Sequence, residues 1–238
     1  MTVCQAEQVG SAGTVSYEQV ASSIAATGMT ARGAFVPHPD DEVPDPMTGR
    51  RARAVVMVGN VGGVDQPMWR RFVRERRDEP DPLDAWTRRT LRPIADDFGA
   101  TFVHPSDRPY LPFQRWARRA ADVWTSPIGL LIDAEHGLWH ALRGALIFGV
   151  DVVGVPPTGV RTSPCIGCHQ PCLSACPVAA FGEAGYDHEA CRSHVRSGSR
   201  PACRTAGCAA RLACPVHPAG AYGPDQMRFH MSAFVGND

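Results

Sequence analysis

Cysteines crowd into one short stretch of this chain, and their spacing constrains its fold more than any other feature. Eight of the nine cysteines lie between residues 165 and 214. The first run reads Cys165-Ile-Gly-Cys168-His-Gln-Pro-Cys172-Leu-Ser-Ala-Cys176-Pro177. It differs from the C-x2-C-x2-C-x3-C-P run of bacterial iron–sulfur proteins by one extra residue between Cys168 and Cys172. A loop with such spacing can wrap three thiolates around one face of a 4Fe-4S cluster.

The remaining cysteines complete a set for two clusters. They are Cys191, Cys203, Cys208 and Cys214, and Pro215 follows the last of them. In the ferredoxin crossover pattern, where the fourth cysteine of a run serves the other cluster, the first cluster takes Cys165, Cys168, Cys172 and Cys214. The second cluster then takes Cys176, Cys191, Cys203 and Cys208. The wide gaps on both sides of Cys208 leave a single cluster as the alternative.

Zinc and disulfides are the other uses that cysteines allow. Structural zinc also uses C-x2-C pairs, but two Cys-Pro closures favour iron–sulfur. Disulfides need an oxidising compartment, and the N-terminus has neither the basic nor the apolar region of a secretory signal. Cys4 stands apart from the others and is expected to be incidental.

Composition narrows the function classes. The chain is 44% hydrophobic and 20% charged, which suffices for a buried core. Its formal net charge is zero, so nucleic acid is not an expected partner. All 24 basic residues are arginine, and the absence of lysine excludes Schiff-base chemistry and the phosphate-loop lysine. No apolar run is long enough for a membrane span, so we expect a cytoplasmic protein with no membrane partner.

Alternating helices and strands are predicted before the cysteines. Expected strands are 34–36, 54–58, 101–103 and 129–132, and expected helices are 68–77, 82–97 and 113–123. Ser16-Tyr17-Glu18-Gln19 resembles a capping box that opens an earlier helix. Val155-Pro156-Pro157-Thr158-Gly159 is rich in turn residues, and beyond it the composition changes. We therefore expect two domains, residues 1–160 and 161–238.

The stretch Gly129-Leu-Leu-Ile-Asp-Ala-Glu-His-Gly137-Leu-Trp139-His-Ala-Leu-Arg143-Gly144, followed by the cysteines, resembles the epoxyqueuosine reductase family. That family uses cobalamin and two 4Fe-4S clusters to remove an epoxide oxygen from a tRNA base. The same region is similar to CblC, which processes cobalamin, through Val103-His104-Pro105, Arg108-Pro109 and Gly137-x-Trp139. The resemblance implies an α+β fold: a flavin-nitroreductase-like core that holds a corrinoid, followed by a ferredoxin-like module with two clusters.

The resemblance also implies a function. The leading hypothesis is an oxidoreductase that binds cobalamin, reduces its cobalt and removes the upper ligand. Its electrons come from an external donor such as a flavodoxin, a ferredoxin or a flavin reductase. The alternatives are a cobalamin-dependent substrate reductase of the epoxyqueuosine reductase type, a two-cluster electron carrier, and a cobalamin chaperone. The chain ends soon after Cys214, which leaves no room for that family's helical-repeat domain and favours processing over tRNA modification.

The resemblance assigns roles to seven further residues. Asp107 stands at about the spacing of the family's catalytic aspartate and is expected to donate a proton, which requires a raised pKa. Tyr110 is a second candidate donor. The expected corrinoid contacts are Gly129, Leu130, Gly137, Trp139 and Arg143. Structural roles stay open: Asp107 as a turn cap, Tyr110 and Trp139 in packing, and Arg143 on the surface. His104, His136, His140 and His169 are conceivable cobalt ligands.

Overall fold

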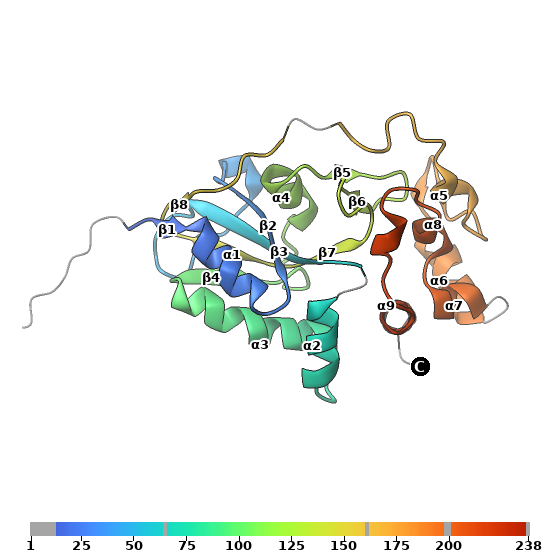
Figure 1. Ribbon diagram of the computed structural model, residues 1–238, viewed down its shortest axis with the longest axis horizontal. Helices are drawn as coiled ribbons and strands as arrows, with labels where there is room; N and C mark the ends of the chain where they lie inside the picture. The colour runs from blue at the N-terminus through green and yellow to red at the C-terminus, as the bar shows by residue number, and fades with distance from the viewer. Residues whose placement is uncertain (1–12, 64–65, 160–161, 198–200, 237–238) are drawn as a thin grey trace, which may run out of the picture.

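The computed structural model in Figure 1 describes residues 13–63, 66–159, 162–197 and 201–236. Cys4 and the expected domain boundary at residue 160 lie outside the described residues. The centre of the fold is a sheet of four antiparallel strands. Their order across the sheet is β2 (Thr30–Phe35), β3 (Ala54–Val61), β7 (His140–Phe148) and β4 (Ala100–Val103).

Helices cover both faces of this sheet, because the central strands are apolar on both sides. Val56 and Leu146 face one core with helices α1 (Tyr17–Ala25), α2 (Pro67–Glu75) and α3 (Pro82–Asp97). Met57 and Ile147 face the other core with helix α4 (Phe113–Ala120). A strand buried on both faces reads as a continuous apolar run, so the strand predicted at 54–58 is confirmed.

The pairing of β3 with β7 is interrupted once. Val58 pairs with Gly144, but Gly59 pairs with Leu142, so Arg143 is the extra residue of a β-bulge. A bulge bends its strand and redirects the side chain of the extra residue. Arg143 is accordingly buried, with 8% of its surface exposed, and the alternative of a surface arginine is wrong.

Several predicted boundaries shift for local reasons. The helix predicted at 82–97 is α3 as expected. Helix α4 ends at Ala120, because Ala121 is extended. The strand predicted at 129–132 shrinks to β6 (Leu131–Ile132), since Gly129 takes a positive φ of 76° in the preceding turn. The capping box at Ser16 is wrong, because the Ser16 side chain makes no capping hydrogen bond.

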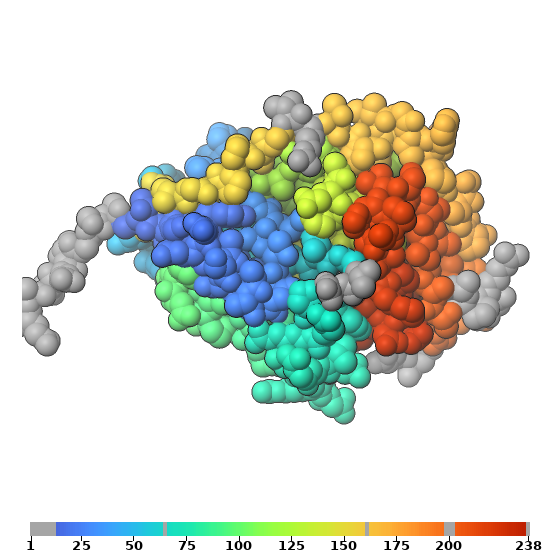
Figure 2. All heavy atoms as spheres, viewed as in Figure 1, coloured from blue at the N-terminus to red at the C-terminus, as the bar shows by residue number. Residues whose placement is uncertain are grey.

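The cysteine-rich part lies at one end of the molecule, beyond one end of β7 (Figure 1). Its elements are α5 (Pro171–Ser174), β9 (Phe181–Gly182), β10 (Gly185–Tyr186), α6 (His188–Ser197), α7 (Pro201–Ala206), α8 (Ala209–Leu212), η2 (Pro218–Gly220) and α9 (Pro224–Val235). The last helix returns to the core, where the Phe229 ring lies 5.3 Å from Trp69 and 5.4 Å from Phe72. Figure 2 shows this red C-terminal segment against the teal of α2.

Short elements complete the fold. They are β1 (Val15–Ser16), η1 (Pro39–Asp41), β5 (Trp124–Thr125) and β8 (Val152–Val153). The mixed composition of helices and an antiparallel sheet confirms the α+β class. In the part of the chain that the structure describes, none of the helices is long and apolar enough to cross a membrane.

Candidate redox and corrinoid site

Four cysteines line one small cavity beside α5. They are Cys165, Cys168, Cys172 and Cys214, the set expected for the first cluster. Burial raises the pKa of the Cys172 thiol, and the nearby Cys214 raises it further. Burial also raises the pKa of Cys165, and the neighbouring Cys214 and Cys168 raise this pKa further. The four cysteines therefore meet at one cavity, although Cys214 is distant in sequence.

The other four cysteines gather between α6, α7 and α8. Burial raises the pKa of Cys191, and Cys176 and Cys203 add to the increase. Burial likewise raises the pKa of Cys208, with contributions from Cys191 and Cys203. These are the cysteines expected to hold the second cluster.

The surroundings of both sets fit iron–sulfur clusters. The Gln170 amide donates to Cys168 Sγ at 3.4 Å, and the Ala180 amide donates to Cys176 Sγ at 3.3 Å. Such bonds stabilise cluster sulfurs and tune their potential. Ser126 Oγ is buried at the first set without a hydrogen-bond partner among the described residues. The donors at each set are thiols, which are the ligands that these clusters use.

No three or more His, Cys, Asp or Glu side chains within the described ranges are arranged to hold a metal ion. Thiolates on one zinc ion must converge, because each Zn–S bond is about 2.3 Å long. In a 4Fe-4S cluster each thiolate binds a different iron, so its ligands stand farther apart. The first four thiols line one cavity without forming a single-ion site, which is compatible with this wider arrangement.

A larger cavity of about 340 Å³ lies between β7 and the C-terminal part. Leu138 belongs both to its wall and to the wall of the cavity lined by the first four thiols. Leu138 also packs with Cys172 and Cys214 in one apolar cluster. Leu138 is therefore shared by the walls of both cavities, and we call the larger one the junction cavity.

Arg143 reaches the junction cavity from the bulge in β7. Its Nε donates to Asn60 Oδ1 at 2.7 Å, and Asn60 Nδ2 lies 3.4 Å from the Tyr222 hydroxyl. Burial lowers the pKa of Arg143, although Tyr222 and Asp84 raise it, and Arg211 lowers it further. The guanidinium still carries its charge, because arginine is not deprotonated in proteins.

Arg211, from α8, forms the opposite part of the wall. Its guanidinium lies 4.4 Å from the centre of the Trp139 ring and 4.7 Å from that of Tyr222. It also donates from Nη2 to the Leu138 carbonyl at 2.5 Å. Trp139 itself is 3% exposed and packs on Tyr222, so it supports the wall rather than lining the cavity.

Two histidines, the buried His140 and the half-buried His230, line the same cavity without adding charge. Burial lowers the pKa of His140 to about 4, assisted by Arg32. Burial, with Arg143 and Arg211, lowers the pKa of His230 to about 3. Both imidazoles are therefore neutral near pH 7, and each is a possible neutral ligand or hydrogen-bond partner.

The structure changes the interpretation of Asp107. Burial raises its pKa, but the His104 amide and the Arg88 guanidinium outweigh burial and hold the pKa below its ordinary value. The expected raised pKa is wrong, because Asp107 accepts a hydrogen bond from Arg88 Nη1 at 2.5 Å and one from the His104 amide at 2.7 Å. Asp107 is not among the described residues that line the junction cavity.

The other predicted residues divide into two groups. Leu130 lines the junction cavity together with Arg143. Tyr110 is 63% exposed and stacks on the Arg108 guanidinium, which lies 3.8 Å from its ring centre. Gly129 forms an open turn. A Cβ on Gly137 would lie 2.2 Å from the Val216 carbonyl, so Gly137 permits close docking of the C-terminal part.

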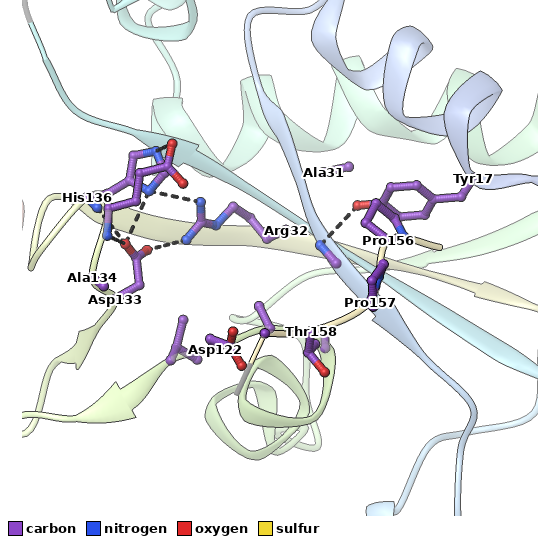
Figure 3. Close-up of a pocket in the computed structure, with 16 residues that line it drawn as sticks. Tyr17, Ala31, Arg32, Asp122, Asp133, Ala134, His136, Pro156, Pro157 and Thr158 are labelled. Atoms are coloured by element: carbon purple, nitrogen blue, oxygen red, sulfur yellow. Dashed lines mark hydrogen bonds and ion pairs between the residues drawn. The ribbon is translucent and has the colours of Figure 1, made fainter. Parts of the chain in front are cut away.

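A second cavity of about 280 Å³ lies along β2, where Ala31, Arg32 and Gly33 form part of its wall (Figure 3). Arg32 Nη2 donates to Asp133 Oδ2 at 2.5 Å and Arg32 Nη1 lies 3.4 Å from His136 Nδ1, while the Gly33 amide donates to the Tyr17 hydroxyl. Burial opposes the ionisation of Asp133, but His136 and Arg32 lower its pKa well below the ordinary value. Arg32, Asp133 and His136 contact one another here, and no cysteine is among the described residues that line this cavity.

Sequence reasoning did not identify four residues of the junction cavity and its supports. They are Asn60, Arg211, Tyr222 and His230. Asn60 interrupts an apolar run and Arg211 stands between two cysteines, but neither position forms a motif. Only the docking of the C-terminal part on β7 brings them together.

Comparisons with known proteins agree with this architecture. No protein-family model matches the chain, and no curated protein matches its sequence. A solved structure of epoxyqueuosine reductase matches 88% of this chain and 70% of its own, with a TM-score of 0.53 and 14% identity. A second, which contains a modified tRNA stem loop, has the same TM-score of 0.53 and 14% identity, over 88% of this chain and 69% of its own. The enzyme from Streptococcus thermophilus has a TM-score of 0.52 and 14% identity over 88% of this chain and 69% of its own. At this identity the similarity is one of fold.

Proposed function

We propose that this protein is a cobalamin-dependent iron–sulfur reductase that acts on an organic substrate, with chemistry of the epoxyqueuosine reductase type. One observation carries the proposal: Leu138 alone forms both the wall of the first thiol set and the wall of the junction cavity. A group in the cavity would thus lie next to a cluster held by those thiols. Fold similarity to epoxyqueuosine reductases supports this interpretation over corrinoid processing.

The finer architecture belongs to the proposal. The core would be flavin-nitroreductase-like, because helices cover both faces of its sheet. The part after residue 160 would be a ferredoxin-like module, because the eight clustered cysteines all follow Val155-Pro156-Pro157-Thr158-Gly159. The cytoplasm is the proposed location. The similarity to CblC stays a prediction.

The chain's residues would divide the work as follows. The eight cysteines would hold two 4Fe-4S clusters, while Arg143, Leu130 and the neutral imidazoles of His140 and His230 would contact a corrinoid. When bound, these groups supply single-electron transfer and a strongly reducing cobalt centre. Leu138 and the Trp139–Arg211 stack would keep water from the space between them. An external protein or flavin reductase would provide electrons.

The candidate proton donor Asp107 is not free for the proposed reaction, because it is paired with Arg88. Asp107 Oδ1 would have to leave Arg88 before it could take up and donate a proton, because an ion pair favours the ionised carboxylate. This same contact favours the second candidate function, in which the protein reduces and delivers cobalamin without protonating a substrate. The tRNA stem loop in one epoxyqueuosine reductase structure stands against our expectation that nucleic acid is not a partner.

Corrinoid binding tests the proposal directly. Hydroxocobalamin would be titrated into anaerobically purified protein and followed by absorption, with Ala141→Trp to fill the junction cavity and Ala134→Trp to fill the second cavity. We expect binding by the wild type and by Ala134→Trp, and loss of binding by Ala141→Trp. Equal binding by both variants would refute the location, and no binding by the wild type would favour a plain electron carrier.

A further inference from the structure

The junction cavity carries positive charge in its wall, and none of the described residues that line it carries a negative charge. Arg143 and Arg211 both line it, and no carboxylate does. The other polar residues of the wall, among them His140, His230 and Tyr222, supply no carboxylate either. Two cations therefore face a largely apolar space, an arrangement that is unfavourable unless an anion joins them.

Arg143 is the less satisfied of the two. A guanidinium has five N–H donors, and within the described residues Arg143 uses only Nε, toward Asn60 Oδ1 at 2.7 Å. Asp84 is the carboxylate near enough to affect it, but Asp84 accepts from the Ser106 hydroxyl and lies 3.7 Å from His104 Nε2. Nη1 and Nη2 of Arg143 thus form no hydrogen bond with any described residue.

The two guanidinium groups are also held in place. Asn60, which is 2% exposed, fixes the Nε edge of Arg143. Trp139, Tyr222 and the Leu138 carbonyl fix Arg211. Positioned arginines whose Nη1 groups form no hydrogen bond with a described residue match the paired oxygens of a phosphate or a carboxylate.

We propose that the junction cavity is an oxyanion-binding site, in which Arg143 and Arg211 take a phosphate or carboxylate group of a small molecule. The proposal deepens the function proposed above, because it shares that cavity. The oxyanion has two possible sources: the phosphodiester of the cobalamin nucleotide loop, or an anionic group of the reductase's substrate.

The test uses inorganic phosphate as the probe, with chloride at matched ionic strength as the reference. We expect phosphate to raise the melting temperature of the anaerobically purified protein saturably. Arg143→Gln should abolish this shift, whereas Arg118→Gln, which removes an exposed arginine on α4, should keep it. An equal response of wild type and Arg143→Gln, or an equal loss in both variants, would overturn the proposal.

A second measurement needs no variant and so does not depend on folding of Arg143→Gln. Phenylglyoxal modifies arginine, and peptide mapping reports each site. We expect phosphate to protect Arg143 and Arg211 of the wild type and to leave Arg118 as reactive as before. Unchanged modification of Arg143 in saturating phosphate would overturn the proposal.

Cobinamide, which lacks the nucleotide loop and its phosphate, distinguishes the two sources. If Arg143→Gln weakens cobalamin binding at least tenfold and leaves cobinamide binding unchanged, the corrinoid phosphate is the oxyanion. If it changes neither but abolishes the phosphate effect, the oxyanion belongs to the substrate. Phosphate binding without any corrinoid binding by the wild type would sink the proposed function and leave the oxyanion site standing.

Discussion

Arg88 Nη1 lies 2.5 Å from Asp107 Oδ1 and holds as an anion the carboxyl group that the sequence offers as a proton donor. The Asp107 side chain is 37% exposed and that of Arg88 24%, so water weakens the pair. A pair of this kind can open when a substrate competes for the carboxylate. Whether it opens decides between substrate reduction and corrinoid delivery.

We expect Asp107→Asn to lower turnover of an organic substrate about a hundredfold, the usual effect of losing a general acid. Corrinoid affinity and cobalt reduction with an artificial donor should be unchanged. Asp84→Asn, which alters a neighbouring carboxylate near His104, is the control and should retain most of the activity. Full activity of Asp107→Asn would point to corrinoid delivery, and loss of corrinoid binding would make Asp107 a structural residue.

Metal content tests both thiol sets. After anaerobic reconstitution we expect about eight iron atoms and eight labile sulfides per chain, as two clusters require. Cys172→Ala should lose about four of each and lower the melting temperature, because cluster binding is coupled to folding. Cys4→Ala is the matched control and should keep both. Full iron in Cys172→Ala would show that this ligand is misassigned, and zinc from iron-replete cultures would remove the redox interpretation.

Gly137 tests the docking of the C-terminal part. Gly137→Ala forces a side chain into a backbone with φ of 57° and within 2.2 Å of the Val216 carbonyl. Gly129→Ala has a comparable φ of 76° but meets no atom within 4 Å. We expect losses of about 3 kcal/mol or more for Gly137→Ala and about 1 kcal/mol for Gly129→Ala. Urea unfolding measures both, and equal losses would show that the close contact with Val216 does not matter.

Buried His140 should make the protein sensitive to mild acid. Its pKa falls from 6.5 to about 4 on folding, so between these values the unfolded chain binds a proton that the folded chain does not. Stability is therefore complete above the unfolded pKa and is lost as the pH falls toward the folded pKa. We expect this residue to account for a loss of about 1–2 kcal/mol between about pH 7 and pH 5.

His140→Gln should remove that part of the loss, because glutamine does not titrate. The exposed His38, changed to Gln, is the matched control and should leave the pH dependence as it is in the wild type. Urea unfolding of reconstituted protein at the two pH values measures the difference, and acid lability of the clusters affects all three proteins alike. An unchanged slope in His140→Gln would contradict the assignment.

The order of residues along short segments predicted those parts of the molecule that interactions between sequence neighbours determine. The apolar run at 54–58 predicts β3, since a strand buried on both faces needs no polar alternation. The ferredoxin crossover pattern grouped Cys214 with Cys165, Cys168 and Cys172, and these four line one cavity; short loops place only the first three, and Cys214 joins them through the fold. Asp107, by contrast, was expected to have a raised pKa, and no local pattern indicated that Arg88, nineteen residues earlier, would pair with it.

The resemblance named Leu130 and Arg143, but only the tertiary structure brings them together with the other walls of the junction cavity. Arg143 lies in an apolar strand, where alternation gives no reason for a buried charge; the bulge opposite Val58 and Gly59 turns it inward. Arg211 and Tyr222 join it because Gly137 lets the C-terminal part approach β7 closely. The sequence by itself determined the apolar strands and the short spacings within the first run of cysteines. The cavity beside the first four thiols depends on contacts between residues that are far apart along the chain. No short segment of the sequence shows these contacts, so the charge and the walls of the cavity could not be predicted from it.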